Sequence, residues 1–252
     1  MTKSIPSVSV SYAQNGSSTT SNEYGMRVMQ ERAFERRGEQ YLLIKSPPAS
    51  GKSRALMFIA LDKLHNQGLK QAIVVVPEKS MGSSFNKEPL SDFGFEWDWT
   101  VPPQWNLCNV PGGDDGKIGA VGRFLESDDR VLICTHATFR FAVDNFGIEA
   151  FDNRLIAIDE FHHVSANPDN KLGAHLGHLI ARGMVNVVAM TGKCSKLPTA
   201  LIIFLDFIQK CHALGACHLR VEELVSTTHE CPSSNKVGRE SGLSIGGSGS
   251  FV

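Results

Sequence analysis

Residues 41–53 read YLLIKSPPASGKS, and this stretch decides the fold. Its first part, 41–45, is almost entirely apolar and is typical of a buried β-strand. The next eight residues are small or turn-forming, and an apolar helical pattern follows from Lys52 onward. A strand, a loop of small residues and a helix place main-chain N–H groups and a helix N-terminus around one point. The stretch therefore predicts a phosphate-binding loop.

The loop matches the phosphate-loop motif G-x-x-x-x-G-K-[ST] except at its first position, which is Ser46. In that motif the lysine, here Lys52, neutralises phosphate charge, and the hydroxyl of Ser53 ligates Mg²⁺. Serine resists the positive φ that glycine permits, so we expect a loop entrance of different shape. The alternative is a chance Gly-Lys-Ser at the start of a helix. The residues expected to bind ATP are Ser46, Pro47, Pro48, Ala49, Ser50, Gly51, Lys52 and Ser53.

A second apolar strand, 155–158, ends in two carboxylates, Asp159 and Glu160. Ligands of open α/β sheets bind at the carboxyl ends of the strands, which is where these side chains project. We expect Asp159 to hold Mg²⁺ and Glu160 to deprotonate an attacking water. The catalytic candidates are therefore Lys52, Asp159 and Glu160, and ATP and Mg²⁺ are the expected cofactors.

Short β-rich runs alternate with helical patterns along the chain. Strands are expected at 41–45, 72–76, 105–110, 131–135, 155–158 and 185–190, and helices at 24–37, 52–66, 116–125 and 171–182. This alternation is typical of an α/β fold with a mainly parallel sheet that is covered by helices on both faces.

Composition limits the possible functions. The 252 residues contain 42% hydrophobic residues, so the chain can bury a core. Lys plus Arg number 25 and Asp plus Glu number 26, for a net charge of −1. This balance excludes a strongly basic nucleic-acid coat protein but permits a local basic groove.

Localisation is expected to be cytoplasmic, without a membrane partner. No apolar run approaches the roughly 18 residues of a membrane helix, and the first residues lack the apolar core of a secretory signal. The six cysteines are irregularly spaced, which favours a reducing compartment.

Three regions differ in composition. Residues 1–22 are rich in Ser and Thr and predict a flexible tail. Residues 23–193 contain the α/β pattern and both motifs. Residues 194–252 end in Gly-Gly-Ser-Gly-Ser and form a poorly defined extension, with a truncated or frameshifted origin as one hypothesis.

Several motifs together resemble one family. Asp159-Glu160-Phe161-His162 is similar to the DExH form of motif II in superfamily-two helicases and translocases. Met26-Arg27 with Gln30 resembles the R-x-x-Q element, and Met190-Thr191-Gly192 resembles motif III. Over residues 24–192 the chain resembles the first RecA-like domain of DEAD/DEAH-box proteins, in the type III restriction Res-subunit and UvrB-like group.

The resemblance implies roles for further residues. Gln30 would recognise adenine, and His162 and Thr191 would couple the nucleotide site to strand movement. Contacts with the nucleic-acid backbone are implied for Lys79, Ser80, Thr135, His136 and Thr138. The chain departs from the family at Pro48 and Ala49, where Thr and Gly are usual, and at Thr191-Gly192, where Ser/Thr-Ala-Thr is more common.

The resulting hypothesis is an ATP-hydrolysing domain of a helicase or translocase that moves nucleic acid, with DNA expected over RNA. Restriction-modification or other helicase-associated subunits are the expected protein partners. Two alternatives remain: a non-catalytic nucleotide- or nucleic-acid-binding module, and a different P-loop ATPase that acts as a switch. The first alternative gains weight because residues 194–252 are too few for the second RecA-like domain, which in the family supplies an arginine finger.

Three further clusters have two interpretations each. The aromatic residues around Trp97, Trp99 and Trp105 either stack on bases or pin a long loop. His162, His163, His175 and His178 suggest a metal site, but His162 already has a role in motif II. The cysteines and histidines of 211–231 match no familiar zinc spacing, so we interpret them as ordinary side chains.

Overall fold

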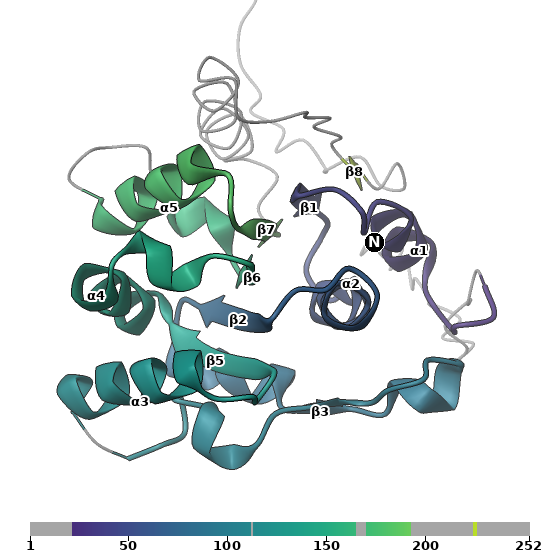
Figure 1. Ribbon diagram of the computed structural model, residues 1–252. Helices are drawn as coiled ribbons and strands as arrows, with labels where there is room; N and C mark the ends of the chain where they lie inside the picture. The colour runs from purple at the N-terminus through teal and green to yellow at the C-terminus, as the bar shows by residue number, and fades with distance from the viewer. Residues whose placement is uncertain (1–21, 112, 165–169, 193–223, 226–252) are drawn as a thin grey trace, which may run out of the picture.

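The computed structural model describes residues 22–111, 113–164, 170–192 and 224–225. Six parallel strands form the central sheet in the order β5-β2-β6-β7-β1-β8 (Figure 1). The strands are β1 (Tyr41–Lys45), β2 (Gln71–Val76), β5 (Val131–Thr135), β6 (Arg154–Ile158), β7 (Asn186–Thr191) and β8 (Leu224–Val225). The strands expected near 41, 72, 131, 155 and 185 are therefore confirmed.

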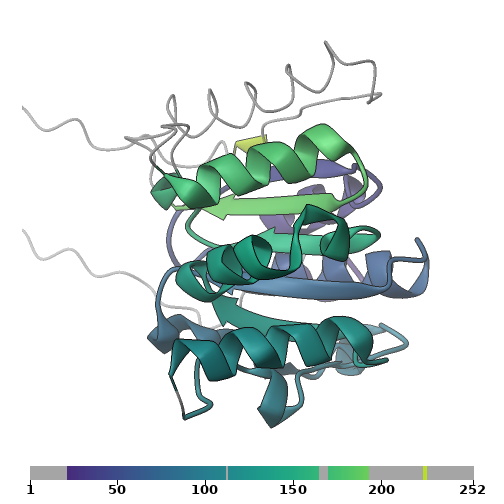
Figure 2. The ribbon, with the colours of Figure 1, turned by 60° about the vertical axis from the view of Figure 1, so that its left-hand side comes forward.

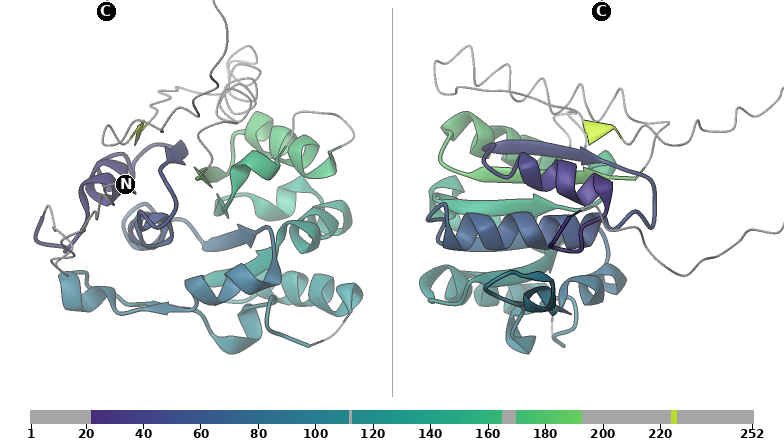
Figure 3. Two further views of the ribbon diagram at one scale, coloured as in Figure 1. Left: turned by 180° about the vertical axis from the view of Figure 1, so that it is seen from behind. Right: turned by 90° about the vertical axis from the view of Figure 1, so that its right-hand side faces the viewer.

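Helices cover both faces of this sheet. They are α1 (Val28–Glu35), α2 (Lys52–His65), α3 (Asp114–Glu126), α4 (His136–Phe146) and α5 (Lys171–Arg182). Figure 2 shows α3, α4 and α5 side by side on one face, and Figure 3 shows α1 and α2 together on the other. The predicted α/β class, with a mainly parallel sheet between two helical layers, is confirmed.

The core explains the composition of the strands. Every residue of β2 is buried, and residues 72–76 of β2, 131–134 of β5 and 155–158 of β6 are all apolar. A strand that is covered on both faces cannot alternate polar and apolar residues, so its sequence is continuously apolar. All the loops that carry the motifs then leave this rigid sheet at its carboxyl edge.

One local prediction is wrong, and the bounds of one helix were left open. The strand expected at 105–110 is instead a 3₁₀ turn, η3 (Pro103–Trp105), followed by one bridge between Asn106 and Ile133. Pro102 and Pro103 donate no N–H and fix φ, so they favour a turn. A helix was expected between the strands at 131–135 and 155–158, but the bounds of α4 were not predicted, because its β-branched and aromatic residues are weak helix formers. Packing on the sheet and the Thr135 cap stabilise it instead.

The aromatic segment between β2 and α3 has a structural role. It contains η1 (Lys79–Phe85), η2 (Leu90–Phe93) and an antiparallel pair, β3 (Lys87–Glu88) and β4 (Trp99–Thr100). Trp99 is buried and donates its indole N–H to the carbonyl of Phe85 at 2.6 Å. Trp105 is also buried and donates to Asp129 at 2.6 Å. Burial of these two rings excludes base stacking by them and supports the loop-pinning interpretation.

The predicted tail 1–22, apart from Asn22, and the extension 194–252, apart from β8, lie outside the described residues. The cysteine- and histidine-containing stretch 211–231 lies outside them too, except at β8.

Short 3₁₀ turns η4 (Ile148–Phe151) and η5 (Phe161–His163) complete the described elements. Within the described ranges, no helix is long and apolar enough to cross a membrane, and no three or more His, Cys, Asp or Glu side chains cluster so as to hold a metal ion.

Candidate nucleotide-binding site

The predicted phosphate loop connects the carboxyl end of β1 to the N-terminus of α2. Ala49 and Gly51 have positive φ values of 60° and 89°. Ser46, where glycine was expected, instead continues the sheet: its N–H donates to the carbonyl of Thr191 on β7 at 3.1 Å. Ser46 therefore avoids the positive φ that serine resists, and the left-handed conformation falls later in the loop, at Ala49 and Gly51.

Two residues of the R-x-x-Q element hold the loop from outside. The Gln30 side-chain amide donates to the carbonyl of Gly51 at 3.0 Å, and its oxygen accepts from the N–H of Arg27 at 2.8 Å. The Arg27 guanidinium donates to the carbonyl of Ala49 at 2.9 Å. A Cβ added to Gly51 would lie 2.4 Å from Gln30 Nε2, so only glycine fits there. These contacts fix the two positive-φ residues of the loop.

Lys52 lies in the first turn of α2 and turns back over the loop. Its ammonium donates to the carbonyls of Ser46 and Pro47 at 3.1 and 3.0 Å. Burial lowers the pKa of Lys52, while the charges of Glu160 and Asp159 oppose this shift. The same interaction links the phosphate loop electrostatically to the carboxylates at the end of β6. Ser53 follows Lys52 in the same turn.

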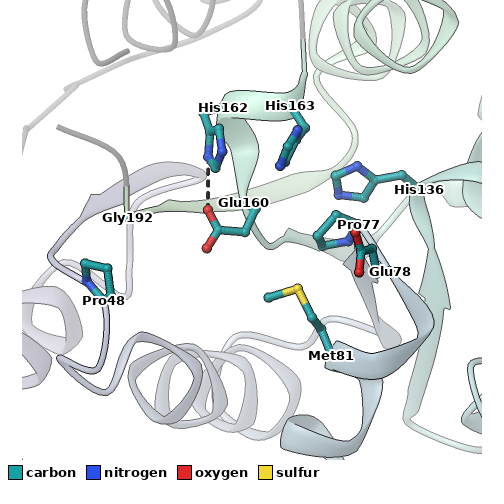
Figure 4. A pocket seen from close by; sticks show the side chains of 9 residues that line it. All are labelled: Pro48, Pro77, Glu78, Met81, His136, Glu160, His162, His163 and Gly192. Atoms are coloured by element: carbon teal, nitrogen blue, oxygen red, sulfur yellow. Dashed lines mark ion pairs between the residues drawn. The ribbon is translucent and has the colours of Figure 1, made fainter. Parts of the chain in front are cut away.

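The two motif II carboxylates have different environments. Asp159 is 5% exposed, and burial raises its pKa to about 6. Its N–H donates to the carbonyl of Val75 on β2, and its carboxylate accepts from the N–H of Glu160, both at 2.9 Å. Glu160 has φ 49° and ψ 49°, a left-handed conformation that is uncommon for a residue with a side chain. This turn directs Glu160 away from the strand and into the cavity (Figure 4).

The predicted coupling residues contact each other and Glu160. The Nδ1 atom of His162 lies 3.0 Å from the Glu160 carboxylate and 3.3 Å from the hydroxyl of Thr191. Thr191 is fully buried, and its carbonyl is the acceptor for Ser46. A chain of contacts therefore runs from Glu160 through His162 and Thr191 to the phosphate loop.

A cavity of about 550 Å³ lies between these segments (Figure 4). Its lining residues are Pro48, Pro77, Glu78, Met81, His136, Glu160, His162, His163 and Gly192. A Cβ at Gly192 would lie 3.3 Å from Lys52 Nζ, so glycine here leaves room for the lysine. Sequence reasoning did not place Pro77, Glu78, Met81 or His163 at the nucleotide site.

The donor set fits a nucleotide phosphate and a divalent cation. The hydroxyl oxygens of Ser46 and Ser50 are buried without a hydrogen-bond partner in the structure. Buried hydroxyls of this kind are normally satisfied, so they favour a polar ligand. The Lys52 ammonium and the N-terminus of the 14-residue helix α2 provide positive charge beside them. Asp159 and Ser53 supply oxygen atoms of the type that Mg²⁺ prefers.

The residues expected to contact nucleic acid fall into two groups. Lys79 and Ser80 begin η1 and are exposed. Thr135 instead caps α4: its hydroxyl accepts from the N–H of Thr138 at 3.2 Å and lies 3.0 Å from the Thr138 hydroxyl. His136 turns toward motif II, with Nε2 at 3.1 Å from the carbonyl of Asp159. Both groups lie at the carboxyl edge of the sheet.

Comparison with known families identifies the class of protein. The chain belongs to the DEAD/DEAH box helicase family, which matches residues 27–192. The match includes the phosphate loop, motif II and Thr191-Gly192, the segments that surround the cavity. This is therefore a helicase-type domain with a RecA-like fold.

Among individual proteins, the chain is 57% identical over 185 residues to "Putative ATP-dependent helicase YeeB" of Bacillus subtilis (strain 168). The match covers 73% of this chain, and the chain spans only 31% of the length of that relative.

Solved structures similar to this chain include the Pyrococcus furiosus Hef helicase domain (TM-score 0.48, 17% identity, covering 80% of this chain and 38% of that one). The UvsW helicase of bacteriophage T4 has a TM-score of 0.45 and 17% identity, over 72% of this chain and 56% of that one. The Sulfolobus solfataricus SWI2/SNF2 ATPase core, solved with dsDNA, has a TM-score of 0.45 and 15% identity, over 77% and 37% of the two chains.

Proposed function

We propose that residues 23–193 bind and hydrolyse ATP and couple hydrolysis to movement along nucleic acid, with DNA as the expected substrate. The observation that carries this proposal is the position of Glu160, which extends into the same cavity that the phosphate loop borders (Figure 4). A base and a phosphate cradle on opposite walls of one cavity are what in-line attack of water on a phosphate requires.

Each residue of the site has a proposed role. Ser46, Pro47, Pro48, Ala49, Ser50 and Gly51 form the cradle for the phosphates. Lys52 exchanges its two carbonyl acceptors for phosphate oxygens, because these carry more negative charge. Ser53 and Asp159 would hold Mg²⁺, which when bound neutralises charge on the phosphate oxygens. Gln30 keeps the loop in shape from behind.

Glu160 is the proposed general base. Its carboxylate is partly exposed at the cavity and accepts a contact from His162 at 3.0 Å, which restricts its orientation. His162 also contacts Thr191, whose main chain supports Ser46. We propose that this chain of contacts reports the state of the phosphates to the carboxyl edge where nucleic acid binds.

The proposed nucleic-acid surface consists of Lys79 and Ser80 together with the N-terminus of α4, where Thr135 and Thr138 lie. An exposed lysine and main-chain N–H groups are suited to phosphate oxygens and carry no sequence information. Such a surface fits a protein that moves along its substrate. A cytoplasmic location and an association with restriction-modification or other helicase subunits are part of the same proposal.

The second candidate is a module that binds nucleotide without turning it over alone. It is favoured by the lining of the cavity, since none of the described residues that line it is an arginine. An arginine that stabilises the transition state contributes about 10³–10⁵ in rate. A domain without one would depend on a further domain or partner for fast hydrolysis.

Steady-state ATPase assays with single-stranded DNA, duplex DNA and RNA distinguish these candidates. Turnover that rises with nucleic acid supports the motor domain, whereas tight ATP binding without turnover supports the binding module. The Lys52→Ala variant is the control for the site. If that variant binds ATP as tightly as the wild-type protein, the nucleotide-site assignment fails.

A further inference from the structure

His136 makes an unusual long-range contact. It is the first residue of α4, directly after β5, and its Nε2 atom lies 3.1 Å from the main-chain carbonyl of Asp159 at the end of β6. In the sheet, β2 lies between β5 and β6, so the imidazole crosses the end of one strand to reach the next. The ring lines the cavity on the wall opposite Pro48 (Figure 4).

The chemistry of this contact determines which atom carries the proton. A carbonyl oxygen only accepts hydrogen bonds, so Nε2 of His136 must be the donor. Burial lowers the pKa of His136 to about 4, against the effect of the neighbouring carbonyls of Asp159 and Val75. The Nε2 proton of His136 is therefore engaged by the Asp159 carbonyl rather than offered to a nucleic-acid phosphate.

The Asp159 carbonyl belongs to the peptide unit that orients Glu160. On the other side of that unit, the N–H of Glu160 donates to the Asp159 carboxylate at 2.9 Å. Both polar groups of the peptide are thus held, one by His136 and one by Asp159. Glu160 itself is left-handed, a conformation that is unfavourable for a residue with a Cβ and persists only when its surroundings fix it.

We propose that His136 is a positioning residue that holds the Asp159–Glu160 turn and ties the orientation of Glu160 to the N-terminus of α4. This inference rests on the proposed function, because it assigns the α4 terminus to nucleic acid and Glu160 to hydrolysis. Its consequence is a second connection between the proposed nucleic-acid surface and the nucleotide cavity, which is separate from the His162–Thr191 contact. Displacement of α4 would move the Asp159 carbonyl and with it the base.

Two substitutions separate the hydrogen bond from the ring. His136→Phe keeps a flat ring but removes the donor, and His136→Gln keeps an N–H donor at the reach of Nε2 but removes the ring. We expect His136→Phe to lower kcat for ATP about tenfold, with KM for ATP and Kd for DNA within about twofold of wild type. His136→Gln should recover kcat to within about threefold. His178→Phe, the same change at an exposed histidine of α5, should leave kcat unchanged.

Amide hydrogen exchange of residues 155–164, measured on the full 252-residue chain without nucleotide, tests the contact independently of turnover. Faster exchange in His136→Phe and wild-type exchange in His136→Gln support the proposal even if the wild-type protein hydrolyses no ATP, in which case only the proposed function fails. Unchanged exchange in His136→Phe overturns the proposed positioning role of His136. Loss of DNA binding in His136→Phe with an unchanged kcat overturns it as well. Should His136→Phe not fold, a His136→Gln protein with fast exchange would overturn it equally.

Discussion

The two edges of the central sheet differ in how far their buried polar groups are hydrogen-bonded. At the amino edge, Gln71 and Arg154 are buried at the starts of β2 and β6 and lie side by side in register. The Gln71 amide donates to the carbonyls of Phe124, Ser127 and Asp129 at 2.6, 3.1 and 3.0 Å. Arg154 donates to Gln71 and to the carbonyls of Ala150, Asp152 and Leu125 at 2.7 to 3.1 Å.

Among the described residues, unfavourable features concentrate at the carboxyl edge. Ala49 and Glu160 have positive φ, and the hydroxyls of Ser46 and Ser50 are buried without a partner in the structure. Asn153 at the amino edge also has positive φ, but asparagine tolerates that conformation. Strain and unsatisfied polar groups concentrate where a ligand can compensate for them. The polar groups of the amino edge therefore stabilise the fold, whereas those of the carboxyl edge have the features of a candidate ligand-binding site.

The largest expected effect is a catalytic one at the carboxyl edge. Glu160→Gln keeps the size of the side chain but removes the base, so kcat should fall about 10³-fold. ATP affinity should stay within a few-fold, and Tm within about 2 °C, because the turn is held by main-chain contacts. Single-turnover and binding measurements check both. Glu126→Gln, at an exposed glutamate at the end of α3, is the matched control; a similar loss of kcat there would undermine the assignment.

At the amino edge we expect the reverse, a loss of stability without a catalytic defect. Arg154→Met leaves Gln71 Oε1 and three carbonyls without their donor, which should lower the free energy of unfolding by about 3 kcal/mol. Urea denaturation measures this, and kcat per folded molecule should be unchanged. Arg182→Met removes an exposed pair with Asp152 and should cost at most about 1 kcal/mol. Equal losses in the two variants would contradict the contrast between the edges.

Sequence predicted the sheet well because its strands depend on local pattern. Continuous apolar runs such as β2 and the strand before Asp159 have few alternatives to a doubly covered strand. The placement of the two motifs at one edge was also predictable, because Gly51-Lys52-Ser53 and Asp159-Glu160 each come soon after such a strand. Whether the individual roles of these side chains are right stays a prediction.

The missed features depend on contacts between distant segments. The bounds of α4 depend on the Thr135 cap and on packing, which local propensity does not reveal. The strand expected at 105–110 is absent because Pro102 and Pro103 start a turn and Trp105 is tied to Asp129. The His136 contact with Asp159 was equally inaccessible, since the two residues adjoin only through the strand order of the sheet.

A smaller effect should appear in the pH dependence of stability. The pKa of Asp159 is raised from 3.8 to about 6, so the folded state retains the proton that the unfolded state loses between these values. In the free protein, stability therefore falls as pH rises through this window, and the ionised Asp159 is costly above it. Asp159→Asn removes that cost. The free energy of unfolding of Asp159→Asn, minus that of the wild-type protein, should therefore be about 2 kcal/mol larger at pH 7.5 than at pH 4.5.

Parallel urea titrations of the two proteins at both pH values, without nucleotide or Mg²⁺, measure this difference. The comparison cancels the other carboxylates, because they are common to both proteins. A difference between Asp159→Asn and wild type that does not change with pH would show that Asp159 titrates normally. The Gln71–Arg154 pair offers no such response between pH 4.5 and 7.5, since it consists of an amide and a guanidinium.

The smallest expected effect concerns Gln30, which lies at the binding edge but resembles the residues of the other edge. It is 2% exposed, and both ends of its amide are already bonded, to Gly51 and to Arg27. Gln30→Ala should therefore weaken ATP and GTP binding by the same factor, about tenfold or 1.4 kcal/mol, by loosening the loop. Gln40→Ala, which removes contacts to Gly183 and Val185 at the amino end of β1, should leave nucleotide affinity unchanged. A loss confined to ATP would instead mean that Gln30 leaves the loop to read adenine, and the loop would then be held by Arg27 alone.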